Sequence, residues 1–341
     1  MIDRYKFQNA FDTFGIKGSF LLGMDYLRTL ALGDKVKVSP RSIQIEPNNT
    51  CNLRCEMCDI YALAKKEICN LNFENFKKII SNFNYWHSLR LWGVGEPFLN
   101  KDIFKIIKYE SDKGNYVNLS TNANLLDKDT IQKIIDSGLK KLIISIDGGT
   151  KKLYEKIRRG AKWEKLMESL QLIKEMITDK RKKPVVRITT IIMRQTIHEL
   201  KNIITLAHKY NINTVLVQEL QTGHPGIHIS KKESVAAEKK ALQALKQMVI
   251  EGKKKNVNVI IPDLKVRTKR ERCVSPWLQV YITCNGDVTP CCRNISKSHY
   301  ICGNILEEPF KNIWNNKKYQ NYRKALREGN LPSICKNCNM L

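Results

Sequence analysis

The sequence predicts an α/β fold, a partial (β/α)6 TIM-like barrel followed by a small cysteine-rich C-terminal domain. From about residue 42, short β-rich runs alternate six times with helical, charge-bearing stretches. Some runs, such as LIISI at 142–146, are continuously apolar, which is typical of parallel strands buried on both faces. The segment 273–341 departs from this pattern and holds most of the eleven cysteines.

The alternation fixes where each element is expected. A strand, a helix and a parallel strand in one sheet form a right-handed crossover, and six units fall short of a closed eight-unit barrel. We therefore expect an open barrel. The expected strands are SIQIEP (42–47), SLRLWG (88–93), YVNLST (116–121), KLIISID (141–147), VVRITTII (185–192) and TVLVQEL (214–220). The expected helices lie near 73–83, 102–113, 128–137, 151–177, 197–209 and 231–254.

The chain divides by composition into four parts. In the last part, LQVYITCNGDVTPCC (278–292) has two alternating runs around an Asn-Gly pair, which predicts a β-hairpin. A segment this small lacks a large core of its own and favours a metal staple. The parts are an N-terminal extension (1–40), the partial barrel (41–262), a basic linker (263–272) and the C-terminal domain (273–341).

The chain of 341 residues has a net charge of +26, and its densest basic run is KVRTKRER at 265–272. That run is either a solvated linker or a contact for an anionic partner. We recognise no RNA-binding module, so nucleic acid is not an expected partner. The stretch 19–33 is interrupted by Asp25 and Arg28, which predicts an amphipathic helix and not a membrane span.

We expect a cytoplasmic protein without a membrane partner, because no charged-then-apolar leader precedes that stretch. Thiols stay reduced in the cytosol. Many cysteines in a cytosolic chain indicate metal binding and not disulfides.

The run CNLRCEMC (51–58) places Cys51, Cys55 and Cys58 in one loop after the first strand. A closed zinc or iron–sulfur site takes four ligands, so three thiolates leave one position open. The spacing resembles the radical SAM superfamily. The resemblance implies a [4Fe–4S] cluster held at three irons, with S-adenosylmethionine (SAM) on the fourth. A zinc knuckle or plain buried thiols are the alternatives.

Residues at other strand ends resemble the SAM-binding positions of the same superfamily. GVGEP (93–97) looks like its glycine–glutamate motif, and Met57 replaces the aromatic residue that usually packs near adenine. Each of these residues also has an ordinary explanation as a turn, cap or surface residue, and Arg159 is the alternative to Arg158. The SAM contacts implied by the resemblance are Met57, Gly93, Gly95, Glu96, Asn122, Ser145 and Arg158.

A second cysteine set resembles the twitch form of the SPASM domain, which holds one auxiliary [4Fe–4S] cluster. Cys292 is the rival of its neighbour Cys291 as a ligand, and a zinc ribbon is the alternative for the whole set. Cys69, Cys284 and Cys302 are interpreted as small buried hydrophobic residues. The four ligands implied by the resemblance are Cys273, Cys291, Cys335 and Cys338.

The resemblance implies an oxidoreductase- or isomerase-type enzyme that cleaves SAM reductively and abstracts hydrogen from a substrate carbon, with flavodoxin or ferredoxin as reductant. A fully ligated auxiliary cluster suits an electron relay. We favour oxidation or epimerisation of a small polar metabolite, such as a sugar or aminocyclitol. Forty residues before the barrel are too few for a leader-peptide recognition domain, although a separate recognition protein would remove that argument.

The alternatives are a peptide maturase, an RNA-modifying enzyme and a non-catalytic electron-transfer protein. Glu219, at the end of the sixth strand, is the candidate proton acceptor. His224 and His228 follow it in a loop and have no assigned role.

Overall fold

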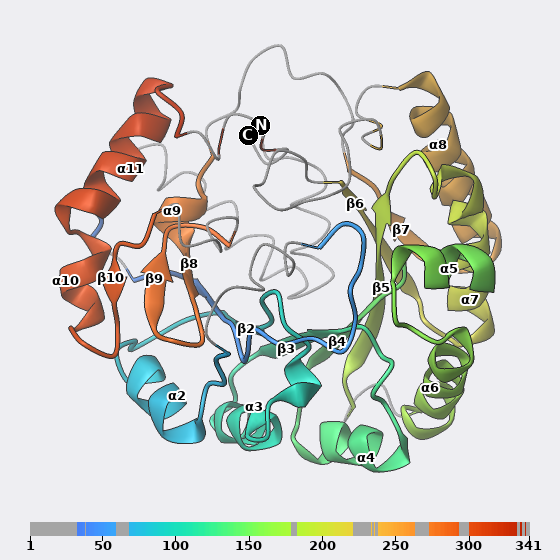
Figure 1. Ribbon diagram of the computed structural model, residues 1–341, viewed down its shortest axis with the longest axis horizontal. Coiled ribbons are helices and arrows are strands. Elements are labelled where there is room, and N and C mark those ends of the chain that lie inside the picture. Colours follow the sequence, from blue (N-terminus) through green and yellow to red (C-terminus); the bar gives the residue numbers. More distant parts are fainter. Residues whose placement is uncertain are drawn as a thin grey trace.

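A ten-stranded sheet in the order β10-β9-β8-β1-β2-β3-β4-β5-β6-β7 forms the framework of the described part of the chain. The sheet curves, and helices α2 to α8 cover its outer side (Figure 1). The computed structural model describes residues 33–37, 39–58, 68–178, 183–220, 233, 235, 238–262, 273–292, 300–332, 335 and 338. The expected helix at 19–33, except Gly33 at its end, the basic run at 265–272, His224 and His228 lie outside these residues.

The six predicted strands are present and pair in parallel in chain order. One further strand, β7 (Asn258–Ile260), extends the sheet beyond the sixth and was not predicted, because three residues are too short for a clear periodicity. The predicted strands are β1 (Ser42–Ile45), β2 (Ser88–Leu91), β3 (Val117–Thr121), β4 (Lys141–Ser145), β5 (Val185–Ile192) and β6 (Thr214–Glu219).

The helices follow their strands as predicted, with two differences. The helix expected near 231–254 begins only at Lys239. The single helix expected over 151–177 is two helices, because the chain turns at Gly160, whose φ is +90°. The helices are α2 (Phe73–Ile80), α3 (Ile103–Ser111), α4 (Lys128–Asp136), α5 (Lys151–Ile157), α6 (Trp163–Met176), α7 (Leu200–Lys209) and α8 (Lys239–Lys254), with 3-10 turns η2 (Pro97–Leu99) and η3 (Ile197–Glu199).

Side-chain caps mark where some helices begin. Asn72 accepts a hydrogen bond from the backbone N–H of Asn75 at the start of α2, at 2.8 Å. Asp127 accepts from the N–H of Thr130 at the start of α4, at 2.7 Å. Each cap satisfies an N–H that has no partner inside its helix, typically contributing about 1 kcal/mol.

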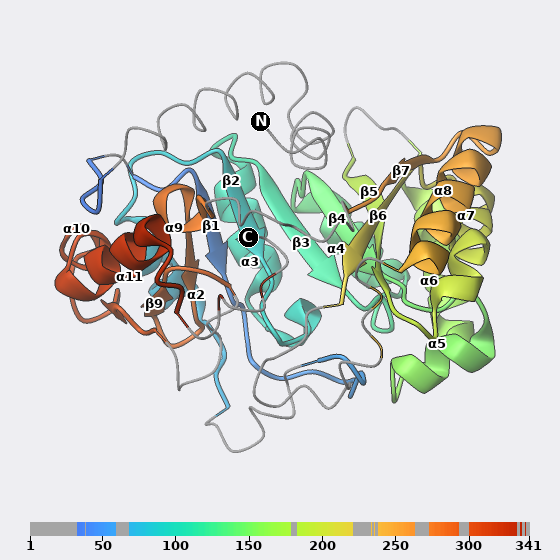
Figure 2. The ribbon, with the colours of Figure 1, turned by 90° about the horizontal axis from the view of Figure 1, so that it is seen from above.

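The predicted C-terminal hairpin is present, and it joins the barrel sheet. Strand β8 pairs with β9 in antiparallel, and Gly286 in the turn has a φ of +87°. The other side of β8 pairs with β1 in parallel, with Ile282 opposite Ile45. Figure 2 shows the C-terminal elements beside β1 at one end of the sheet. The C-terminal elements are α9 (Ser275–Leu278), β8 (Gln279–Ile282), β9 (Asp287–Thr289), β10 (Gly303–Asn304), α10 (Phe310–Trp314) and α11 (Lys317–Glu328).

The C-terminal elements share the hydrophobic core of the barrel. Trp277, Val280 and Ile282 are buried in the same cluster as Ile43 and Ile45 of β1. The cysteine-rich segment therefore gains stability from this common core, and a metal is not its only support.

Cys69 and Cys284 form a disulfide across 215 residues, with their Cα atoms 5.9 Å apart. The sequence analysis, which expected free thiols here, was wrong on this point. The pairing of β8 with β1 brings Cys284 to the segment that follows the cysteine loop. That segment is held in place because the N–H of Cys69 donates to Asn49 Oδ1 at 2.8 Å. Cys302 is buried and forms no disulfide, as expected.

The two faces of the sheet differ in chemistry. Alternate strand residues face opposite sides, and the apolar set, including Ile43, Leu89 and Leu119, is fully buried beneath the helices. We call the other side the inner face. There, Gln44 lies opposite Arg90, Arg90 opposite Asn118, and Asn118 opposite Lys141. A polar row thus crosses four strands of the inner face.

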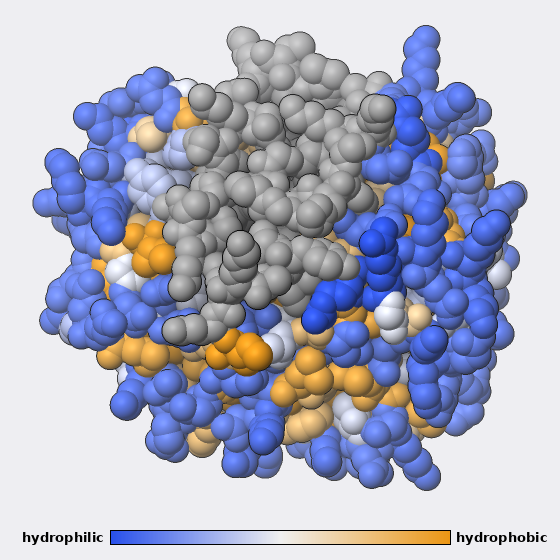
Figure 3. All heavy atoms as spheres, in the orientation of Figure 1, coloured by the Kyte–Doolittle hydropathy of each residue, from blue (hydrophilic) through white to orange (hydrophobic). Residues whose placement is uncertain are grey.

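The outside of the molecule is mostly hydrophilic on the face shown in Figure 3, in keeping with the charged composition. No helix in the described part of the chain has the length and apolar character needed to span a bilayer.

Candidate functional site

The cysteine loop follows β1 and is clamped to the turn after α5. The N–H of Arg54 donates to the carbonyl of Arg159 at 2.8 Å, and the N–H of Glu56 donates to that of Ile157 at 2.9 Å. The Glu56 carboxylate also pairs with Arg159 at 3.0 Å. These contacts fix the loop against the C-terminal end of α5.

The three loop thiols are shielded from solvent to different degrees. Cys55 is buried, whereas Cys51 and Cys58 are half-buried. Burial raises the pKa of Cys51 to about 11. Cys58 donates its N–H to the carbonyl of Cys55 at 3.2 Å, which closes the turn between them.

Within the described residues, no group of three or more His, Cys, Asp or Glu side chains could hold a single metal ion. A four-iron cluster makes a different demand, since each thiolate binds a separate iron at a corner of the cube.

The glycine–glutamate motif lies at the carboxyl end of β2, where it is packed against the first loop. A Cβ on Gly95 would lie 2.0 Å from Asn48 Oδ1, and one on Gly93 would lie 2.4 Å from Glu46 Oε1. Both positions therefore need glycine for packing, independently of any ligand.

Glu96 joins the ends of two strands. Its carboxylate accepts from Thr121 Oγ1 at 2.7 Å and from the N–H of Asn122 at 2.9 Å. The side chain is buried, and burial raises its pKa to about 7. The structure thus gives Glu96 a clear positioning role, which is to hold the start of the loop after β3.

Asn122 and Ser145 lie at the carboxyl ends of neighbouring strands. The Asn122 amide donates to Asn52 Oδ1 at 2.9 Å, and this contact brings it to the cysteine loop. Ser145 is half-buried at the end of β4, opposite Thr189 in β5. The sequence did not single out Asn52, because a loop asparagine beside a cysteine carries no signal of its own.

Arg158 and Arg159 have different environments. Arg159 is exposed and bound to Glu56, whereas Arg158 is buried and pairs with Asp147 at 2.5 Å. The buried Nε of Arg158 has no hydrogen-bond partner among the described residues. Its positive charge lowers the pKa of Cys55, although the larger effect of burial raises that pKa overall. Arg158 can therefore donate to a further anion through this Nε.

Glu219 and Met57 lie near this edge of the sheet. Met57 is half-buried and packs against a small cluster that includes Ile157 and Leu220. Glu219 is half-buried at the end of β6, opposite Ile192, while its neighbour Gln218 is exposed and opposite Ile191. The alternation of side chains puts Gln218 on the inner face and Glu219 in the row that faces the helices.

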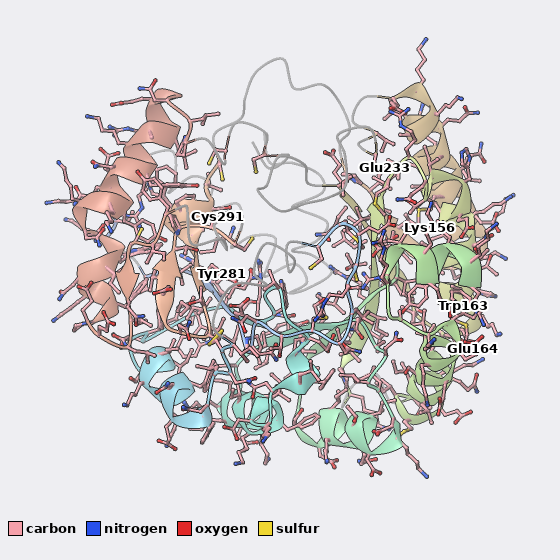
Figure 4. All side chains as sticks on the ribbon, viewed as in Figure 1. Lys156, Trp163, Glu164, Glu233, Tyr281 and Cys291 are labelled. Atoms are coloured by element: carbon pink, nitrogen blue, oxygen red, sulfur yellow. A yellow bond between two sulfur atoms is a disulfide. The ribbon has the colours of Figure 1, made fainter. Side chains whose placement is uncertain are left out.

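The C-terminal cysteines belong to the segment whose strands extend the sheet beyond β1. Cys291, just after β9, is half-buried and lies near Tyr281, across the molecule from α5 and α6 (Figure 4). Cys273, just before α9, is half-buried as well. Cys338 donates its N–H to the carbonyl of Cys335 at 3.2 Å, which is the same turn as in the first cysteine loop.

The family model of the radical SAM superfamily matches residues 45–207. That of the SPASM iron–sulfur cluster-binding domain matches residues 273–339. The chain is a radical SAM enzyme with a SPASM domain. The two matches include all seven cysteines assigned to clusters in the sequence.

Among its relatives by sequence is the PqqA peptide cyclase of Bradyrhizobium diazoefficiens. The two are 23% identical over 315 residues, which cover 88% of this chain and 78% of that protein.

Solved structures share the fold. SuiB of Streptococcus suis, solved with S-adenosylmethionine, superposes with a TM-score of 0.70 at 17% identity, over 91% of this chain and 73% of SuiB. SuiB has also been solved bound to its precursor peptide SuiA. BtrN, in complex with AdoMet and 2-DOIA, gives a TM-score of 0.53 at 18% identity, over 89% of this chain and 94% of BtrN.

This radical SAM enzyme uses SAM, a [4Fe–4S] cluster and an auxiliary cluster. The residues present fit the first two, because three thiols share one clamped loop and Arg158, whose Nε has no partner among the described residues, acts electrostatically on Cys51 and Cys55. A guanidinium is well suited to the SAM carboxylate.

Proposed function

We propose that this radical SAM enzyme modifies a peptide, as a peptide or protein maturase. The observation that supports this most is the similarity to PqqA peptide cyclase, which extends over 88% of the chain. SuiB, which shares the fold over a similar extent, binds a precursor peptide. The peptide interpretation, an alternative in the sequence analysis, now has more support than the small-metabolite interpretation that we favoured there.

In this proposal each cysteine set holds its own cluster. Cys51, Cys55 and Cys58 hold the cluster that binds SAM. When bound and reduced, that cluster with SAM supplies a 5′-deoxyadenosyl radical, which takes hydrogen from a substrate carbon. The auxiliary cluster is held by Cys273, Cys291, Cys335 and Cys338.

The chain's own residues orient and shield the SAM site. Arg158, held by Asp147, offers its free Nε to the SAM carboxylate. Asn122 and Ser145 supply polar groups at the strand ends, and Met57 supplies an apolar surface for the base. Gly93, Gly95 and Glu96 fix the backbone at the end of β2, which would hold the SAM amino group.

Glu219 is our candidate for the group that removes a proton from the substrate. Its row faces the helices, so a shift of the strand end would be needed to bring its carboxylate to the inner face. The matched test compares Glu219→Gln with Gln218→Ala. Loss of product only in Glu219→Gln supports the assignment. Loss only in Gln218→Ala would mean that Gln218, and not Glu219, contacts the substrate.

The test of the proposed function uses short peptides encoded beside the gene. Each peptide, made with deuterated side chains, is incubated with reconstituted enzyme, SAM and a reductant. We expect one peptide to change mass and to transfer deuterium to 5′-deoxyadenosine, as measured by mass spectrometry. No transfer from any peptide, with transfer from a deuterated sugar or aminocyclitol, would restore the small-metabolite function.

That second candidate keeps one observation in its favour. BtrN, which shares the fold with a TM-score of 0.53, was solved in complex with 2-DOIA. The deuterium experiment includes both substrate classes for this reason.

A further inference from the structure

Tyr322 of α11 contacts one of the cysteines assigned to the auxiliary cluster. Its hydroxyl oxygen lies 3.1 Å from the sulfur of Cys335. The tyrosine is 1% exposed and the cysteine 9% exposed, so water competes little for either group. The contact is a hydrogen bond between two buried side chains.

The surrounding structure holds the tyrosine ring in place. Tyr300 packs edge-to-face against it, with ring centroids 4.8 Å apart. Asn316 caps the start of α11, where its side chain accepts from the N–H of Tyr319 at 2.9 Å. Arg323, the next residue along, lies between the rings of Trp314 and Tyr319 at 4.3 Å from each centroid. The hydroxyl therefore has little freedom to turn away.

A thiolate that binds iron has no proton to donate, so in the loaded protein the phenol must be the donor. A hydrogen bond to a cluster sulfur stabilises the more negative, reduced state of the cluster. We propose that Tyr322 is a positioning residue that raises the reduction potential of the auxiliary cluster through Cys335. This inference rests on the proposed assignment of Cys335 as a ligand.

The same helix supplies a matched control. The Tyr319 hydroxyl is also buried, but it has no hydrogen-bond partner among the described residues. Tyr319→Phe and Tyr322→Phe each remove one buried oxygen from α11. Only Tyr322→Phe removes a hydrogen bond to a cysteine sulfur.

The test is a potentiometric titration followed by electron paramagnetic resonance. The background is the full chain with Cys51, Cys55 and Cys58 replaced by Ala, so that the auxiliary cluster is the one observed. We expect Tyr322→Phe to shift the potential to a more negative value, with unchanged iron content, and Tyr319→Phe to leave it in place. Equal shifts in both variants, or none in Tyr322→Phe, would overturn the proposal.

A second measurement covers the case in which Tyr322→Phe binds less iron. In the Cys51/Cys55/Cys58 background, transfer to D2O should shift the Fe–S stretching bands more than it does in the clusters that Tyr322→Phe still binds, which lack the phenol O–H, as measured by resonance Raman spectroscopy. Tyr319→Phe should retain the larger shift, and equal shifts in all three proteins would contradict the inference. Failure of the ligand assignment gives a different result, since Cys335→Ala would then keep its auxiliary iron.

Discussion

Cys291 and Cys292 are neighbours in sequence but differ in exposure. Cys291 is half-buried after β9, and its carbonyl accepts from Thr289 Oγ1 at 3.0 Å, while Cys292 is exposed. We expect Cys291→Ala to lose the auxiliary cluster, and therefore about half of the iron, and Cys292→Ala to retain it. Iron and sulfide analysis after anaerobic reconstitution measures this.

The reverse result would make Cys292 the ligand.

Glu96 predicts a dependence of stability on pH. An unfolded carboxyl ionises near pH 4.5, whereas burial raises the pKa of Glu96 to about 7 in the fold. Between these values the unfolded state has already lost the proton that the folded state keeps, so a rise in pH favours unfolding. Ionisation of Glu96 lowers the free energy of unfolding by about 3 kcal/mol by pH 8.

The measurement is urea denaturation of the parent and of Glu96→Gln at pH 5 and pH 8. We expect the free energy of unfolding to fall more in the parent than in the variant, because glutamine does not ionise. Equal falls in both proteins would mean that Glu96 does not have the raised pKa.

At the scale of the elements, the contact between β8 and β1 decides how the two cluster sites lie. Cys51 follows β1, and Cys291 follows β9, the partner strand of β8. The two predicted cluster sites are therefore connected through adjacent strands of one sheet. The Cys69–Cys284 disulfide links the same two regions covalently.

We expect Cys284→Ser to lower the free energy of unfolding of the oxidised protein by about 2–4 kcal/mol, because the disulfide closes a long loop in the unfolded chain. Denaturation with and without a reductant measures this. The reductant should lower the stability of the parent and leave that of Cys284→Ser unchanged. Alkylation of both thiols in the native, oxidised parent would contradict the disulfide.

At the scale of the whole molecule, two clusters predict the iron content. The reconstituted enzyme should hold about eight iron and eight sulfide. Replacing Cys51, Cys55 and Cys58 together with Ala should halve this content and abolish SAM cleavage. If the parent held only about four iron, and replacing Cys335 and Cys338 did not change that number, the prediction of an auxiliary cluster would be wrong.

The two sites should also separate by function. The residues proposed to bind SAM lie between 57 and 158, outside the C-terminal domain. We expect Cys335→Ala/Cys338→Ala to release 5′-deoxyadenosine but to make little modified substrate, measured together by mass spectrometry. Its first cluster, counted as iron, is the control. Product at the parent rate would show that the second site is structural only.

The sequence by itself determined the six parallel strands, the hairpin and the two cysteine sets. These depend on local signals: alternating or continuous hydrophobicity, an Asn-Gly turn and fixed cysteine spacings. The family comparisons confirm the radical SAM and SPASM domains. The roles of individual site residues, including Arg158 and Glu219, stay predictions.

Only the tertiary structure decided how distant parts meet. The pairing of β8 with β1, the Cys69–Cys284 disulfide and the clamp of Glu56 on Arg159 each join residues far apart in sequence. No local pattern encodes them, because they form only when the folded sheet brings distant segments of the chain together. The contact of Tyr322 with Cys335 arises in the same way, from a helix packed over a turn that follows it.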